Sequence, residues 1–215
     1  MGFGENHVIE PGNMVQARGY TVSAISGLLT TVAADGLVFG LRNVATDVEG
    51  IPGKSGSRAV TEALVVTGVR VRFAPVTAFG SAQGLLFRGY KVNGFTAIQT
   101  TGGTAVRAHY KRVGNIRGAG SFRAPLTDIS AYIADTGAIT GGTFLAQTAR
   151  EPEFVAVAAG AVQPAIVETI EPGALWLPQP LEADQGLIID CGITMGASGT
   201  GYLFVDVECH RPNIG

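Results

Sequence analysis

Charged side chains are scarce in this chain of 215 residues. Asp, Glu, Lys and Arg together make up 15% of it, against roughly 25% in an average globular domain. Hydrophobic residues reach 46%, which excludes an intrinsically disordered chain. So few charges are expected to leave part of the folded surface uncharged, and this favours an oligomer or a component of a larger assembly.

Cysteines and long apolar runs are also few. Cys191 and Cys209 are too few for a disulfide scaffold. They are expected to be small buried residues in a reducing compartment, with a cross-strand disulfide as the alternative. No run of about eighteen apolar residues occurs, so no membrane span is expected. The first residues lack a basic region followed by an apolar core, so no secretory signal is expected either.

Helical periodicity is nearly absent, because apolar residues do not recur at spacings of three and four over any long stretch. Short β-rich segments alternate instead with turn residues, and 31 residues are glycine. This pattern predicts an all-β fold: one antiparallel β-sandwich, jelly-roll-like, over residues 21–215. Residues 1–20 show little alternation and are expected to form an extended N-terminal arm.

Four segments alternate clearly between apolar and polar positions. In 61–73 the odd positions from 67 onward are expected to face the core, which places Arg70 and Arg72 on the opposite face. In 85–92 the apolar phase slips at Gly89, which predicts a bulge there. The segments 189–195 and 203–209 are expected to pair as a long antiparallel hairpin, with both cysteines on its apolar face.

The few charges are unevenly distributed along the chain. Positions 54–123 hold eleven of the fifteen Lys and Arg residues and a single acid, Glu62, for a net charge of +10. Positions 1–53 have a net charge of −3, and positions 128–215 have one of −9. Charge segregation of this kind concerns partners and orientation, not the fold.

The basic residues alternate along two of the expected strands, in 61–73 and in 105–113. If these strands are neighbours, their basic side chains form one face. We take as candidate contact residues Arg70, Arg72, Arg88, Lys91, Arg107, His109, Lys111 and Arg112.

Such a face has four interpretations: a nucleic-acid patch, an acidic-glycan site, a subunit contact, or an ordinary solvated sheet face. Readers of single-stranded nucleic acid usually place exposed aromatic residues among the basic ones. Here Phe73 and Tyr110 fall at positions that alternate with the basic ones, so they are expected on the apolar face of their strands. This argues against nucleic acid. The acidic final third of the chain offers a complement, so contact between subunits is favoured.

No arrangement of residues in the sequence indicates a reaction. Asp206 and Glu208 share one expected strand face, and paired carboxylates can serve glycoside hydrolysis or Ca²⁺ binding. The solvated face of an amphipathic strand explains them equally simply and is commoner. The three histidines, His7, His109 and His210, have no metal-ligand spacing. We therefore predict no catalytic, cofactor or metal site, and no enzyme.

The chain resembles a loosely defined group of small β-rich virion proteins of tailed phages. The segments that carry the resemblance are 69–73, 76–83, 102–105, 134–140, 144–147 and 199–208, the last being the most distinctive. They span about residues 60–208, and none of them is a catalytic motif. The extended residues 1–20 depart from the pattern of the group.

The resemblance implies a structural virion protein, assembled in the host bacterial cytoplasm. We expect a capsid decoration (cement) protein that binds and stabilises the outer shell. Its expected partners are the major capsid protein or other virion subunits and further copies of itself, with a trimer favoured. The alternative is a receptor- or glycan-binding knob of a head or tail fibre, with recognition by loops such as 47–57 or 114–121.

Overall fold

The computed structural model describes residues 18–44, 63–77, 87–98, 101–111, 129–154, 168–170, 179–195 and 199–211. Within these ranges the chain forms twelve strands and no helix, and every strand pairing is antiparallel. The expected all-β antiparallel class is thereby confirmed. In the described part there is accordingly no helix that could cross a membrane.

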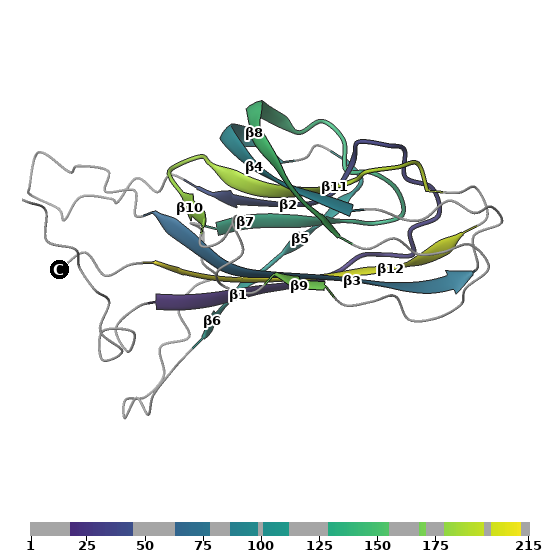
Figure 1. Cartoon of the computed structure of the whole chain (residues 1–215), viewed down its shortest axis with the longest axis horizontal. Helices are drawn as coiled ribbons and strands as arrows, with labels where there is room; N and C mark the ends of the chain where they lie inside the picture. The colour runs from purple at the N-terminus through teal and green to yellow at the C-terminus, as the bar shows by residue number, and fades with distance from the viewer. Residues whose placement is uncertain are drawn as a thin grey trace, which may run out of the picture.

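The strands form two six-stranded sheets that lie as layers one above the other (Figure 1). The first sheet has the order β10-β3-β12-β1-β6, with β9 also paired to β3, and the second has the order β5-β7-β2-β11-β4-β8. The first sheet contains β1 (Arg18–Ile25), β3 (Leu64–Thr77), β6 (Ala108–Lys111), β9 (Glu168–Ile170), β10 (Gln179–Leu181) and β12 (Thr200–Arg211). The second sheet contains β2 (Gly36–Asn43), β4 (Phe87–Ala97), β5 (Gly103–Val106), β7 (Ile129–Ala134), β8 (Thr143–Phe154) and β11 (Gly186–Cys191).

Period-two alternation explains the first sheet. In β3 the apolar Val69, Val71 and Phe73 are buried, while Arg70 and Arg72 are exposed, as expected. In β12 buried residues likewise alternate with half-buried or exposed ones, and the strand pairs with β3 along 200–210 and with β1 along 204–211. One face of this sheet therefore packs against the second sheet, and the other is open.

The central strands of the second sheet have no polar face. All six residues of β11 are buried, as are five consecutive residues of β2. Part of the reason is local, because Ile139 pairs with Leu37 and the Ile98 side chain lies against Gly40. Ile139 extends the sheet in its plane beside Leu37, and Ile98 covers the face of β2 to which Gly40 belongs. A continuous apolar sequence is what such doubly covered strands require.

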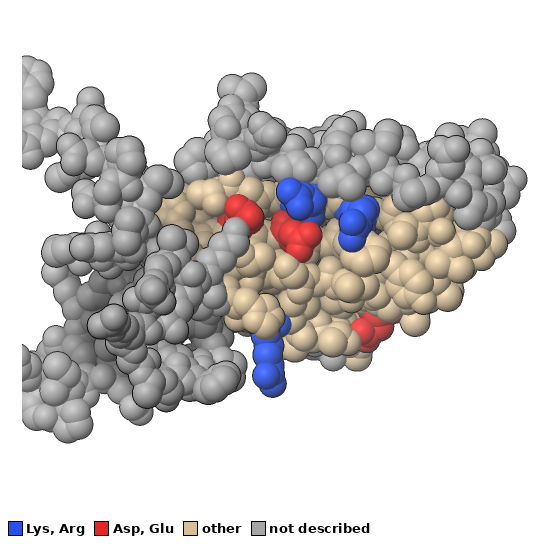
Figure 2. Space-filling model, turned by 90° about the horizontal axis from the view of Figure 1, so that it is seen from below, with Lys and Arg blue, Asp and Glu red and all other residues tan. Residues whose placement is uncertain are grey.

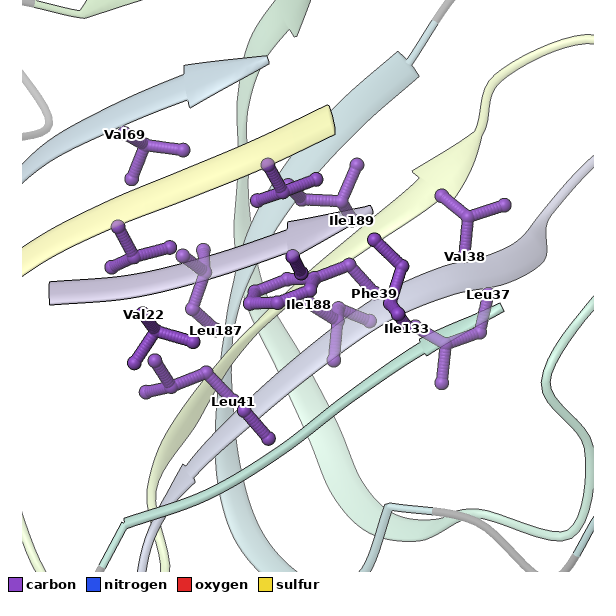
Figure 3. Packing of buried hydrophobic residues seen from close by; sticks show 14 of the residues in the cluster. Val22, Leu37, Val38, Phe39, Leu41, Val69, Ile133, Leu187, Ile188 and Ile189 are labelled. Carbon is purple, nitrogen blue, oxygen red and sulfur yellow. The ribbon is translucent and has the colours of Figure 1, made fainter. Parts of the chain in front are cut away.

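The core is one cluster to which both sheets contribute (Figure 3). Val22 and Val69 come from the first sheet, and Phe39 and Ile189 from the second. The rings of Phe73 in β3 and Phe87 in β4 have centroids 5.9 Å apart. A contact of this kind joins the two layers directly.

Two details of strand pairing differ from the sequence-based expectations. The segments predicted to pair as a hairpin are β11 and β12, which lie in different sheets, so that prediction is wrong, although both cysteines are buried. Alternation identifies the face of a strand but not its partner, and this caused the error. The register does shift beside Gly89, but the additional residue is on β8, between Glu151 and Glu153, rather than in β4. Tyr90 is buried because β4 is covered on both faces there.

The predicted N-terminal arm overlaps the first strand. β1 begins at Arg18, so residues 18–20 belong to the sheet, and Tyr20 is part of the core. Residues 1–17 lie outside the described residues. The loops at 47–57 and 114–121 lie outside them as well.

Replacing Gly186 by alanine is expected to destabilise the protein by about 1–3 kcal/mol, the usual cost of overpacking a well-packed core. A Cβ at Gly186 would overlap the carbonyl oxygen of Leu41 and lie 2.5 Å from the Phe95 ring. Gly137→Ala is the matched control, because its Cβ would meet only the Thr31 carbonyl oxygen, at 3.5 Å. Urea denaturation of both variants measures the difference, and equal midpoints would contradict the packing described here.

Candidate contact surface

The two arginines of β3 lie on the open side of the first sheet, which we call the outer face. It is formed by Arg70, Arg72, Tyr202, Phe204, Asp206, Glu208, Ile25, Ser23, Thr21 and His109. The guanidinium carbon of Arg72 lies 4.3 Å from the centre of the Phe204 ring, a cation–π contact. Arg70 is directly opposite Asp206 across the strand pair.

The outer face carries both signs of charge. Asp206 and Glu208 of β12 lie beside β3, so the two arginines are matched by two carboxylates. Burial lowers the pKa of His210, which leaves this imidazole neutral near pH 7. Figure 2 shows blue and red side chains next to one another on this face, within a mostly uncharged surface. Such a face is better suited to a partner with both signs of charge than to a polyanion.

The structure therefore separates the expected basic face into parts. Strands β12 and β1 lie between β3 and β6, so the two basic strands are not neighbours. Arg107 and His109 are exposed, and His109 is opposite Thr21 of β1. Lys111 ends β6 opposite Gly19. Arg112 lies outside the described residues.

Arg88 and Lys91 belong to the other sheet and have partners within the protein. Arg88 donates from Nε to one oxygen of Asp190 and from Nη2 to the other, both at 3.0 Å, and it also donates to Asp35. The hydrogen bonds to Asp190 are the main cause of the raised pKa of Arg88. The Nζ of Lys91 donates to the carbonyl of Pro180 at 2.8 Å, which links β4 to β10 in the first sheet. Both side chains thus make internal contacts of the fold.

Exposed apolar side chains at one end of the outer face were not anticipated from the sequence. Ile25 and Tyr202 of this face are 62% and 38% exposed, and Val76, the additional residue near the end of β3, is 53% exposed. Ile25 is opposite Phe204 in the adjacent strand, and Tyr202 precedes Phe204 by two residues on the same face of β12. The sequence could have shown that Tyr202 and Phe204 lie on this face. They alternate along β12 with Leu203, Val205, Val207 and Cys209, which are buried. Clustered exposed apolar residues of this kind mark contact sites.

The paired acids Asp206 and Glu208 lie on this open sheet face and not in a cleft. Their neighbours in β3 are Arg70 and Gly68. Across the described ranges there is no group of three or more His, Cys, Asp and Glu residues placed to hold a metal ion.

Neither cysteine is expected to react in the folded protein. Burial, with a further contribution from the Asp190 carboxylate, raises the pKa of Cys191 to about 12. Almost no thiolate is then present at pH 8, and the thiolate is the reactive form. In a Cys209→Ser variant, where Cys191 is the single thiol, we expect no labelling by a thiol reagent at pH 8 until denaturant is added. Fast labelling of the native protein would contradict the burial.

Comparison with protein-family models, curated proteins and solved structures gave no match to this chain.

Proposed function

We propose that this chain is a structural virion protein of a tailed phage, a capsid decoration protein that binds the outer shell as a homo-oligomer, with a trimer favoured. It would be assembled into the virion in the bacterial cytoplasm and would have no catalytic role. The outer face of the first sheet is the proposed contact surface.

We also propose that the fold is a jelly-roll-like sandwich. Five strand pairings support this: β1 with β12, β2 with β11, β3 with β9 and with β10, and β4 with β8. Successive strands from β1 to β4 alternate between the two sheets. Two interleaved Greek keys produce this arrangement, which recurs in capsid and lectin domains. Strands β5, β6 and β7 would then be an insertion between β4 and β8.

The observation that supports the contact role most is the composition of the outer face. It combines exposed apolar side chains at one end, Ile25 and Tyr202 among them, with Arg70 and Asp206 side by side in the middle. Apolar area of this kind favours association, while the alternating charges set orientation and discriminate against wrong partners. Repetition over a shell would let many modest contacts add up.

The test is rebinding to purified particles of the encoding phage that lack this protein. We expect saturable binding that weakens as the salt concentration rises, because exposed charges separated by more than a Debye length are screened. Particles that already carry the protein are the control and should take up none. Failure to bind the depleted particles at any salt concentration would overturn the proposal.

A further inference from the structure

A small open pocket lies on elements of the second sheet. Its volume is about 300 Å³, and it is lined by Gly94, Phe95, Thr96, Thr143, Phe144 and Asp184. The lining comes from the end of β4, the beginning of β8 and the turn between β10 and β11. A pocket of this volume is at the lower end of the range for small-molecule sites, which corresponds to one compact ligand unit.

Two aromatic rings provide the apolar part of the pocket. Phe95 and Phe144 make an edge-to-face contact with centroids 5.3 Å apart. Phe95 is fully buried, with its ring close to Gly186, and therefore holds a fixed position. Phe144 is only half-buried and offers accessible ring surface to the pocket.

A carboxylate held in place by the fold provides the polar part. Asp184 accepts hydrogen bonds at Oδ1 from both Nε and Nη2 of Arg42, at 3.2 and 2.6 Å. No hydrogen bond from a described residue ends on its other oxygen, Oδ2, and the Asp184 side chain is 39% exposed. Arg42 is itself fixed by donation from Nη1 to the carbonyl of Thr96 at 3.0 Å.

The backbone at Asp184 is also unusual, because its φ is +60°, in the left-handed region. A residue other than glycine is uncommon there, although aspartate tolerates it better than most. Backbone hydrogen bonds hold it in place, from the Asp184 N–H to Asn43 and from the Phe95 N–H to Asp184. Strained backbone that surrounding structure maintains is a feature of ligand sites.

The remaining polar groups of the pocket are hydroxyls. The Oγ1 atoms of Thr96 and Thr143 lie 2.5 Å apart and both residues are exposed. The pocket thus combines an accessible ring, one carboxylate oxygen and paired hydroxyls. These groups suit a ligand with an apolar face and several adjacent hydroxyls.

We propose that this pocket binds one neutral pyranose unit of a carbohydrate. An apolar face of the sugar packs on Phe144, and adjacent hydroxyls donate to Oδ2 of Asp184 and exchange hydrogen bonds with the threonine hydroxyls. The Asp184 carboxylate disfavours acidic sugars, since like charges repel. This binding site is separate from the outer face and does not depend on the proposed contact with the capsid.

The test is a saturation-transfer NMR titration of the full chain with free neutral hexopyranoses, followed by a glycan array with the same protein. We expect saturable binding of at least one neutral sugar, and at least a tenfold loss of affinity in Asp184→Asn and Phe144→Ala. Glu182→Gln is the matched control, because it makes the same chemical change in the same turn outside the pocket lining, and it should bind as the unaltered protein does.

Thr143→Val serves as a mild second variant if Asp184→Asn does not fold, and it should weaken binding as well. Binding of free sugars in the NMR titration would show that a single sugar unit is sufficient. Binding on the array alone would show that the site requires a longer glycan that contains this unit. Absence of binding in both arms, or equal binding by all variants, would overturn the proposal. Because Asp184→Asn should still rebind depleted particles, failure here is distinguishable from failure of the capsid role.

Discussion

Replacing Arg88 by alanine is expected to destabilise the protein by about 3–5 kcal/mol, the usual cost of removing one partner of a buried ion pair. The partner is Asp190, which is only 3% exposed. Arg88 meets both oxygens of this carboxylate and also pairs with the exposed Asp35 in the turn before β2. Without the guanidinium, Asp190 loses these two hydrogen bonds and must either stay charged in a buried place or take up a proton, and either costs folding free energy.

Urea denaturation of Arg88→Ala measures this effect against a control arginine. Arg72→Ala is that control, because Arg72 is exposed and contacts the Phe204 ring from solvent, so its loss should cost no more than about 1 kcal/mol. Arg88→Lys should be intermediate, because an ammonium retains the charge but not the two parallel hydrogen bonds. Similar unfolding midpoints for Arg88→Ala and Arg72→Ala would contradict a structural role for this pair.

The double variant Arg70→Glu/Arg72→Glu is expected to lose rebinding to depleted particles altogether. It places two new carboxylates beside Asp206 and Glu208, so the charge of the outer face changes from balanced to strongly negative. Like charges at a contact cost several kcal/mol in a typical interface. The loss of the cation–π contact with Phe204 acts in the same direction.

Two further variants make this result specific. Glu182→Lys reverses an exposed charge in the turn after β10, which pairs with the beginning of β3 and not with Arg70 or Arg72, and it should leave rebinding unchanged. Arg107→Glu/Lys111→Glu changes the region of β6, which β12 and β1 separate from β3, and should reduce rebinding less than the β3 variant. Full rebinding by Arg70→Glu/Arg72→Glu, with its fold intact by circular dichroism, would contradict the assignment of the outer face as the contact.

The sequence predicted the buried faces of strands better than their partners. Alternation is regular in β3 from Val69 to Phe73 and along β12, because each packs one face on the core and leaves the other open, but an additional residue at Thr67 shifts its phase earlier in β3. The same alternation could not show that β12 pairs with β1 and β3 and not with β11, since periodicity carries no information on the neighbour. Partners that are distant in sequence are set by the core as a whole.

The candidate residues illustrate the same limit. From the sequence alone, Arg88 resembles the other basic residues of a polar strand face. In the structure, β11 places Asp190, about a hundred positions further along the chain, opposite Arg88. Arg70 and Arg72 were placed correctly on an open face, because local alternation decides that. The pocket was not anticipated, since its carboxylate depends on the backbone conformation at Asp184 and on the long-range pairing with Arg42.

The most direct test of the central claim is the number of copies of this chain in purified particles of the phage that we propose encodes it, measured by quantitative mass spectrometry. The proposed decoration of the capsid predicts hundreds of copies per particle. A handful of copies would place the protein in a tail or fibre and contradict the shell assignment. Its absence from particles would contradict a virion role altogether.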